Sequence, residues 1–163
     1  LRLYRRLDRG TYKEMTLKEL KNTEGRLLGV DFGDSRTGLA VSDPMRNLAS
    51  GRETVKAVGL ENTARLVAEY AKAEGVSGII VGLPKNMDGS CGHRAERAAR
   101  FAGLLGELTG LPVATFDERL STVQASRYLN ATDTRGAKRK GVIDTLSAQI
   151  ILQDALDRMK GME

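Results

Sequence analysis

Acidic residues interrupt or follow apolar segments at three places in this chain. Asp31 falls inside one apolar run, Asp144 falls inside another, and Asp117 and Glu118 directly follow a third. Burying an unpaired carboxylate is costly, so we expect a buried acid to be neutralised, paired with a cation or bound to a metal ion. The three places are therefore the first candidates for chemistry.

Carboxylate oxygens are ligands that hard divalent cations prefer, so converging acids would suit Mg²⁺ or Mn²⁺ and not zinc. Two such ions, roughly 3.5–4 Å apart, would stabilise the attacking and leaving oxygens during phosphodiester cleavage. If the three acidic places meet at one edge of a sheet, they would form a metal-dependent nuclease centre.

Each acid also has a purely structural interpretation. Asp31 would cap the turn that follows it, and Asp144 would pair with Lys140 one helical turn earlier. Asp117 would form a surface ion pair with Arg119, an interaction that contributes little to stability. Each alternative is reasonable alone, but all three together are less so.

Basic residues cluster shortly before the last acid. Four of them stand within six residues with no acid between them: Arg135, Lys138, Arg139 and Lys140. Beside an acidic centre, this cluster would hold the phosphate backbone that carboxylates repel, and a solvated linker is the alternative. The loop at residues 85–90, with Lys85 and Asn86, would line the substrate groove or form an ordinary turn.

Apolar periodicity predicts the elements that must position these residues. Strands are expected at residues 26–32, 37–42, 48–58, 77–83 and 112–116, the first two forming a hairpin. Helices are expected at residues 61–74, 94–108, 121–130 and 141–159, with a linker at 131–139. This order implies an α/β fold with a mixed five-stranded sheet, an antiparallel meander followed by parallel strands, and helices on both faces.

The composition is that of a folded domain. The chain has 163 residues, 40% of them hydrophobic, and a net charge of +5, which argues against disorder. No apolar stretch approaches the roughly 18–20 residues of a membrane span. The single cysteine, Cys91, excludes an internal disulfide framework and favours a reducing, cytoplasmic location. Residues 1–25 are expected to form a flexible basic extension, and residues 26–160 a single domain.

Four segments, in the same order, resemble the bacterial YqgF/RuvX family, whose members are described as candidate Holliday junction resolvases or pre-16S rRNA nucleases. The matching segments are residues 28–44, 81–90, 117–122 and 140–144. The resemblance implies an RNase H-like fold and a divalent-metal-dependent nuclease. It makes Asp31 the first-strand acid, Glu118 the second acid, with Asp117 as its alternative or helper, and Asp144 the last-helix acid.

One feature departs from related resolvases, which place their second acid at the end of the strand that corresponds to residues 77–83. Here that strand ends in Gly82, Leu83 and Pro84, so the resemblance moves the second acid to the following strand. Side chains alternate along an extended chain, so only one of Asp117 and Glu118 should face a metal ion.

The expected substrate is nucleic acid, either precursor rRNA or branched DNA, and the sequence does not decide between them. Precursor rRNA would imply ribosome association, and junction resolution would favour a homodimer with two active sites. One alternative is a non-catalytic RNase H-like module that binds nucleic acid or the ribosome. Another is an ATPase of the actin or sugar-kinase type, which closes two such domains around a nucleotide, whereas this chain supplies one.

Overall fold

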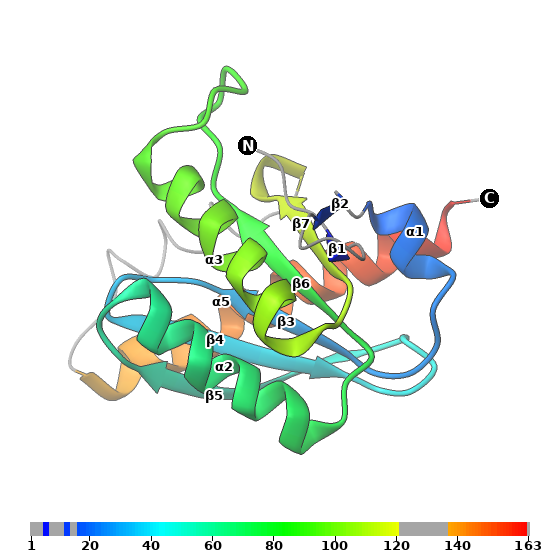
Figure 1. Cartoon of the computed structure of the whole chain (residues 1–163), viewed down its shortest axis with the longest axis horizontal. Coiled ribbons are helices and arrows are strands. Elements are labelled where there is room, and N and C mark those ends of the chain that lie inside the picture. The colour runs from blue at the N-terminus through cyan, green and yellow to red at the C-terminus, as the bar shows by residue number, and fades with distance from the viewer. Residues whose placement is uncertain (1–4, 7–11, 14–15, 121–136, 163) are drawn as a thin grey trace.

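A five-stranded sheet forms the centre of the molecule (Figure 1). The computed structural model describes residues 5–6, 12–13, 16–120 and 137–162, with side chains for 16–120 and 144–162. In spatial order the strands are β5 (Ala49–Lys56), β4 (Arg36–Ser42), β3 (Leu27–Asp31), β6 (Gly78–Leu83) and β7 (Val113–Asp117). The expected five strands are confirmed, with ends that differ by a residue or two.

The sheet is mixed, as predicted. Strands β3, β4 and β5 form an antiparallel meander, while β6 is parallel to β3 and β7 is parallel to β6. Antiparallel neighbours need only a short turn, but parallel neighbours need a crossover connection. Helix α2 (Leu60–Glu74) lies in the chain between β5 and β6, and α3 (His93–Thr109) lies between β6 and β7.

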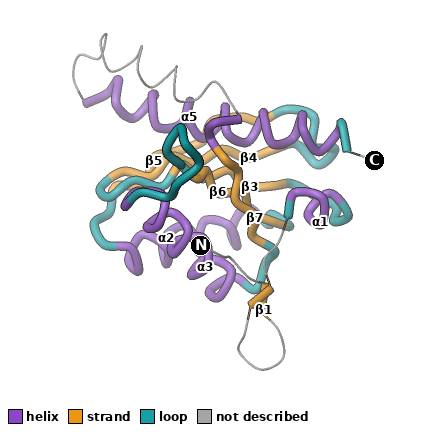
Figure 2. The backbone as a smooth tube through the Cα atoms, turned by 90° about the horizontal axis from the view of Figure 1, so that it is seen from above, coloured by secondary structure: helices purple, strands orange, loops and turns teal. Residues whose placement is uncertain are grey.

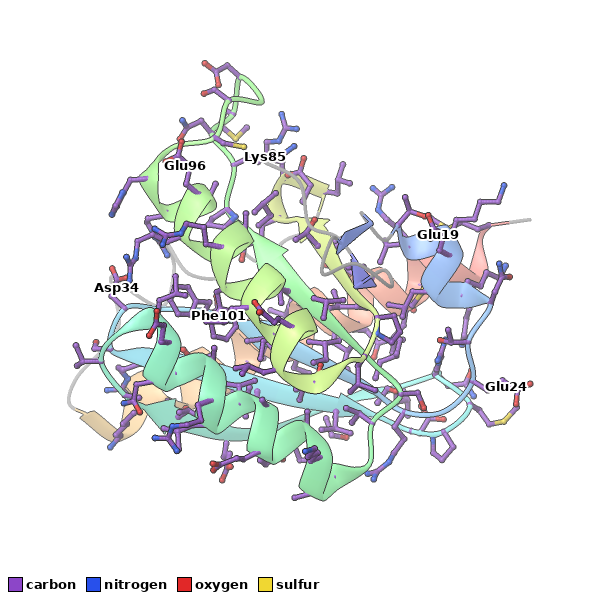
Figure 3. All side chains as sticks on the ribbon, in the orientation of Figure 1. Glu19, Glu24, Asp34, Lys85, Glu96 and Phe101 are labelled. Atoms are coloured by element: carbon purple, nitrogen blue, oxygen red, sulfur yellow. The ribbon has the colours of Figure 1, made fainter. Side chains whose placement is uncertain are left out.

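Helices cover both faces of the sheet, which gives three layers (Figure 2). Helices α2 and α3 pack on one face, and α5 (Ala137–Lys160) packs on the other. The alternation along β3 sends Leu28 and Val30 into the first apolar cluster and Leu27 into the second. By the same alternation Asp31 belongs to the α5 face. On the opposite face Phe101 of α3 stacks on Phe32, with ring centroids 4.3 Å apart (Figure 3).

A short helix lies within the segment that we expected to be a flexible extension. Helix α1 (Leu17–Lys21) is capped by the hydroxyl of Thr16, which accepts from the Glu19 N–H at 3.2 Å. Leu20 is fully buried in the cluster beneath α5, so this part of the extension packs on the domain. Five residues with one buried side chain give no periodic signal. Farther upstream, β1 (Arg5–Arg6) pairs with β2 (Tyr12–Lys13).

The C-terminal third differs from expectation at one boundary. Helix α5 begins at Ala137, so the end of the expected linker at 131–139 is helical instead. The expected helix at 121–130 lies outside the described residues. Strand β7 runs directly into a short 3₁₀ turn at Glu118–Leu120. Within the described ranges, we find no helix with the length and apolarity that crossing a membrane requires.

Candidate active site

A glycine on β4, Gly38, lets α5 lie against the strand that pairs with Asp31. Asp31 ends β3 and pairs with Gly38 of β4. A Cβ atom on Gly38 would overlap the carbonyl oxygen of Asp144, so only glycine allows the α5 backbone to lie this near the sheet. The last-helix acid therefore stands over the direct cross-strand neighbour of the first-strand acid.

A second glycine makes room for Glu118. The Glu118 side chain is only 1% exposed, although it follows the end of β7. A Cβ on Gly82 of β6 would lie 3.0 Å from Glu118 Oε1, so the carboxylate rests against a position that has no side chain. Val30 of β3 pairs with Val81 of β6, and the two strands are parallel. The residues that follow, Asp31 and Gly82, therefore also lie side by side. Asp31, Glu118 and Asp144 thus reach the same face and the same edge of the sheet.

Asp144 is held by Arg36, a residue that the sequence analysis did not select. The Arg36 Nε–H donates to Asp144 Oδ2 at 2.8 Å, and both side chains are 23% exposed. Arg36 begins β4 and stands two residues before Gly38, so the two residues lie on the same face of the sheet, the one that α5 covers. No sequence signal identifies Arg36, because its partner lies 108 residues away in the chain. Asp144 pairs with Arg36, and the side chain of the alternative partner, Lys140, lies outside the described part of the chain.

Asp117 takes the structural role that we considered as its alternative. Two guanidinium nitrogens of Arg119 donate to its carboxylate, with Nη2 to Oδ2 at 2.6 Å and Nε to Oδ1 at 3.1 Å. These hydrogen bonds hold the pKa of Asp117 below its ordinary value against the opposing effect of burial, and the charge of Lys85 lowers the pKa further. Because residues alternate along β7, Asp117 lies on the face opposite to Phe116 and α5.

The loop at 85–90 is an internally bonded turn at the same edge. The Asn86 N–H donates to the Ser90 carbonyl oxygen at 3.0 Å, and the Asn86 side-chain amide donates to Ser90 Oγ at 3.0 Å. The Asn86 amide is thus used within the loop, as in the ordinary-turn interpretation. Hydrogen bonds from Ser90 also lower the pKa of Asp88. Lys85 is half-buried at the base of the loop (Figure 3).

The predicted basic cluster is described only in part. Lys138, Arg139 and Lys140 fall in the first turn of α5, shortly before Asp144, but their side chains are outside the described part of the chain. Arg135 lies outside the described residues altogether. What the backbone establishes is that three of the four cluster residues share a helix with Asp144.

The three acids carry the kind of ligand atom that divalent cations such as Mg²⁺ and Mn²⁺ bind. All three candidates offer carboxylate oxygens, which hard divalent cations prefer as ligands. Within the described ranges, no group of three or more His, Cys, Asp or Glu side chains stands at metal-binding spacing. Asp144 Oδ2 is turned to Arg36 in this arrangement.

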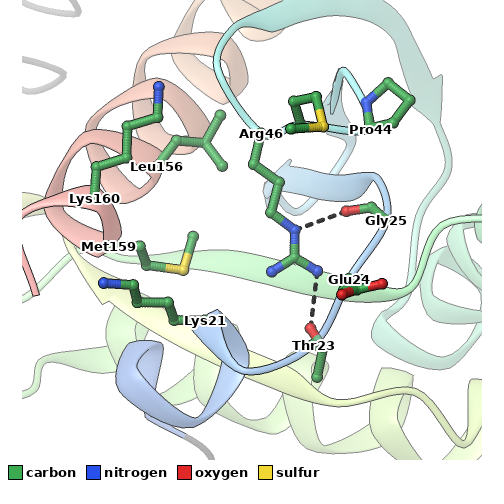
Figure 4. A pocket seen from close by; sticks show the side chains of 10 residues that line it. Lys21, Thr23, Glu24, Gly25, Pro44, Arg46, Leu156, Met159 and Lys160 are labelled. Carbon is green, nitrogen blue, oxygen red and sulfur yellow. Dashed lines mark hydrogen bonds between the residues drawn. The ribbon is translucent and has the colours of Figure 1, made fainter. Parts of the chain in front are cut away.

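A cavity of about 540 Å³ lies at the other end of β3 and α5, away from these acids (Figure 4). Arg46 stands in it with a left-handed backbone, φ 59°, and its guanidinium is fully engaged by the chain. It donates to the carbonyl oxygens of Gly25 and Leu20, at 2.7 and 3.0 Å, and to Thr23 Oγ1 at 2.8 Å. Figure 3 shows Glu24 at this end and Asp34 at the opposite end. The cavity is therefore separate from the acidic site.

Comparison with known proteins supplies a family match. A family model described as "RuvX: Holliday junction resolvase" matches residues 25–158. The chain is 44% identical to a Pelotomaculum thermopropionicum protein over 133 residues, covering 81% of this chain and 86% of that protein. It is 48% identical to a Bradyrhizobium protein (strain ORS 278) over 136 residues, covering 83% and 84%. Both relatives are named as candidate pre-16S rRNA nucleases.

Solved structures support the fold assignment. The chain is similar to Thermus thermophilus RuvC in complex with a Holliday junction substrate, with a TM-score of 0.53, 15% identity, and coverage of 84% of this chain and 96% of that one. A second structure of Thermus thermophilus RuvC gives a TM-score of 0.51 at 14% identity, covering 83% and 96%. At these identities the likeness concerns the fold, and it agrees with the expected RNase H-like architecture.

Proposed function

This chain belongs to the RuvX family of Holliday junction resolvases, and from that premise we propose that it is a nuclease that hydrolyses phosphodiester bonds in nucleic acid. The observation that carries the proposal is the convergence of Asp31, Glu118 and Asp144 on one face and one edge of the sheet. Gly38 makes room for the α5 backbone at Asp144, and Gly82 makes room for the Glu118 carboxylate.

Asp31, Glu118 and Asp144 would hold the divalent cations, Mg²⁺ or Mn²⁺, that such a centre requires. When bound, the cations would neutralise the repulsion between carboxylates and phosphate and stabilise the charge on the attacking and leaving oxygens. The protein supplies the fixed acids and the packing around them. Glu118 is preferred over Asp117 as the second acid, because Asp117 lies on the face of the sheet opposite to α5.

The proposed substrate is precursor 16S rRNA, because the curated relatives bear that name. Branched DNA is the alternative that the family description supports. Cytoplasmic location, association with the maturing ribosome and a homodimer with two sites belong to the same proposal. Sedimentation of the protein, alone and with ribosomal particles, measures the last two directly.

Side-by-side cleavage of both substrates tests the proposal. The parent protein and the variant Asp144→Asn are each incubated with Mg²⁺ or Mn²⁺ and with a precursor rRNA fragment or a four-way DNA junction. We expect the parent to cleave one of the two, and the variant to lose about 100-fold or more in rate, since a neutral amide is a poor cation ligand. Equal cleavage by both proteins would contradict the assigned site.

The Arg36–Asp144 ion pair favours one other candidate function, a module that binds nucleic acid without cleaving it. An arginine that permanently occupied this acid would prevent the acid from serving as a cation ligand. Calorimetric titration with Mn²⁺ separates the two functions. Heat of binding together with cleavage supports the nuclease, whereas nucleic-acid binding without cleavage under any tested cation supports the module.

A further inference from the structure

Arg36 lies beside a candidate acid and is only partly engaged by the chain. It lies on the α5 face of β4, two residues from Gly38, and so borders both Asp31 and Asp144. Only part of its guanidinium is used, because Nε donates to Asp144 while Nη2 is buried and has no hydrogen-bond acceptor within the described part of the chain. Buried donors are nearly always paired, so an unpaired one calls for an explanation.

A phosphate oxygen is the acceptor that fits this position. Guanidinium groups present several N–H donors in a planar fork that matches phosphate geometry, and such charge-assisted hydrogen bonds are short and strong. A polyanion that approaches three carboxylates also needs a positive charge nearby. Arg36 supplies that charge at the site itself.

Other arginines near this edge are already engaged. Arg119 donates to Asp117, and Arg97 Nε donates to Asp34 Oδ1 at 2.8 Å, on the turn between β3 and β4. In neither case does a buried guanidinium nitrogen lack an acceptor in the described part of the chain. The incomplete pairing of Arg36 therefore distinguishes it from these two neighbours.

Nη2 itself is buried, but the Arg36 side chain as a whole is 23% exposed. We propose that Arg36 binds a backbone phosphate of the substrate through the guanidinium nitrogens that do not contact Asp144, while Nε keeps Asp144 oriented. The proposal rests on the proposed function, because it assumes that nucleic acid is bound at the acidic site. It adds a substrate-binding residue that the acid pattern does not contain, and it gives the Arg36–Asp144 ion pair a role in the substrate complex.

The test compares the parent with Arg36→Ala, Arg36→Lys and the matched control Arg65→Ala. Arg65 lies on α2, on the opposite face, and forms an exposed ion pair with Glu69 at 3.3 Å. Affinities for a labelled precursor 16S rRNA fragment and a labelled four-way DNA junction are measured by fluorescence anisotropy over a range of salt concentrations. The binding buffer contains Ca²⁺, because this cation also binds carboxylate oxygens such as those of the candidate site. Thermal melts check that every variant is folded.

We expect Arg36→Ala to weaken binding of whichever nucleic acid the parent binds by about 10-fold, and to reduce the slope of log K against log salt by about 1. Arg36→Lys should lose about 3-fold, because lysine keeps the charge without the fork. Arg65→Ala should stay within about 2-fold of the parent. Calorimetry without nucleic acid measures the Mn²⁺ affinity of Arg36→Ala, which reports the orienting role of Arg36 toward Asp144 separately from the salt slope.

The outcomes separate this inference from the proposed function. If Arg36→Ala binds nucleic acid more weakly than the parent, and the parent cleaves neither substrate, the phosphate contact is supported and the nuclease function is contradicted. An unchanged affinity and salt slope would overturn the phosphate contact, whether or not the parent cleaves. Loss of Mn²⁺ affinity without a change in salt slope would assign Arg36 to orienting Asp144 alone, and would also overturn it. A parent that binds neither nucleic acid overturns both.

Discussion

Asp117 and Glu118 are adjacent in the chain, yet their side chains serve opposite faces of the sheet. Asp117 accepts hydrogen bonds from Arg119, whereas Glu118 is buried against Gly82 on the side of α5. The period-two alternation of a strand is sufficient to separate them in this way. One acid therefore holds a local ion pair, and its neighbour lies on the face of the sheet that carries the other candidate acids.

The Asp117–Arg119 pair predicts a pH-dependent contribution to stability. A carboxyl whose pKa is lowered by folding stabilises the protein above its ordinary pKa, 3.8 here, and loses that contribution as the pH falls through the lowered value. We expect Asp117→Asn to lower Tm by about 2–4 °C at pH 7, and by progressively less below pH 4. Thermal melts of both proteins from pH 2.5 to pH 7 measure the difference.

The control for this prediction is Glu69→Gln. Glu69 pairs with Arg65 on α2, but both side chains are mostly exposed, at 64% and 58%. Its melting temperature should follow that of the parent at every pH. A Tm difference for Asp117→Asn that stays constant down to pH 2.5 would contradict the assigned ion pair.

The acids of the site could be selected from the sequence, but Arg36 could not. Asp31 and Asp144 stand out because a charge within an apolar segment is costly and unusual. An arginine at the start of a strand is ordinary, and the partner of Arg36 lies 108 residues away in the chain. Only the packed structure brings the two together. The choice between Asp117 and Glu118 likewise depended on knowing where β7 ends.

At the level of elements, the approach of α5 to β4 determines the position of Asp144. Gly38 has no side chain, and the α5 backbone at Asp144 occupies the space where a Cβ would stand. The acid is thus positioned by the contact between a helix backbone and a strand backbone. A small displacement of the helix would move the carboxylate away from Asp31.

Gly38→Ala should therefore reduce activity and stability together. The new methyl group must displace α5, and overpacking of this kind typically costs about 1–3 kcal/mol of unfolding free energy. We expect a cleavage rate at least about 10-fold below that of the parent at a temperature where the variant is fully folded, because a displaced ligand is poorly oriented. Denaturant unfolding and single-turnover cleavage provide the two measurements.

Gly161→Ala is the matched glycine control. A Cβ at this position, beyond the end of α5, would lie 3.6 Å from its nearest neighbour, the carbonyl oxygen of Arg158, which is an ordinary contact. Its stability should stay within about 0.5 kcal/mol of the parent. If Gly38→Ala behaved like this control, the close packing of α5 would not be what positions Asp144.

The elements with long periodic patterns were predictable, and those that depend on a few contacts were not. Strands β3 and β4, their hairpin, and helices α2 and α3 follow apolar spacing that is local in the sequence. Helix α1 depends on one side chain, Leu20, buried beneath distant parts of the chain. The start of α5 was placed too late, because the basic residues there resemble a solvated linker.

Across the whole molecule, the two ends of the sheet have different roles. The acids stand where β3 ends and in the first half of α5, while α1 packs where β3 begins and α5 ends. The net charge of +5 does not report this division. What matters for a polyanionic substrate is that the acids occupy one edge and that Arg36 stands among them.

This division predicts that a substitution at the α1 end of the sheet can lower the stability of the protein without lowering its cleavage rate. Leu20 is fully buried and packs against Gly78 at the start of β6, so Leu20→Ala should lower the unfolding free energy by about 2–5 kcal/mol. The cleavage rate should remain within about 2-fold of the parent below the melting transition. Lys18→Ala, an exposed change on the same helix, should alter neither quantity. A large loss of activity in folded Leu20→Ala would show that the two ends are coupled.

The most direct test of the central claim is the cleavage rate of Glu118→Gln beside that of Asp117→Asn, with the same substrate and the same divalent cation. Both substitutions remove one charge from neighbouring residues whose side chains lie on opposite faces of the sheet. If Asp31, Glu118 and Asp144 form the centre, Glu118→Gln loses about 100-fold or more and Asp117→Asn stays within about 3-fold of the parent. A loss confined to Asp117→Asn, or full activity in Glu118→Gln, would contradict the account.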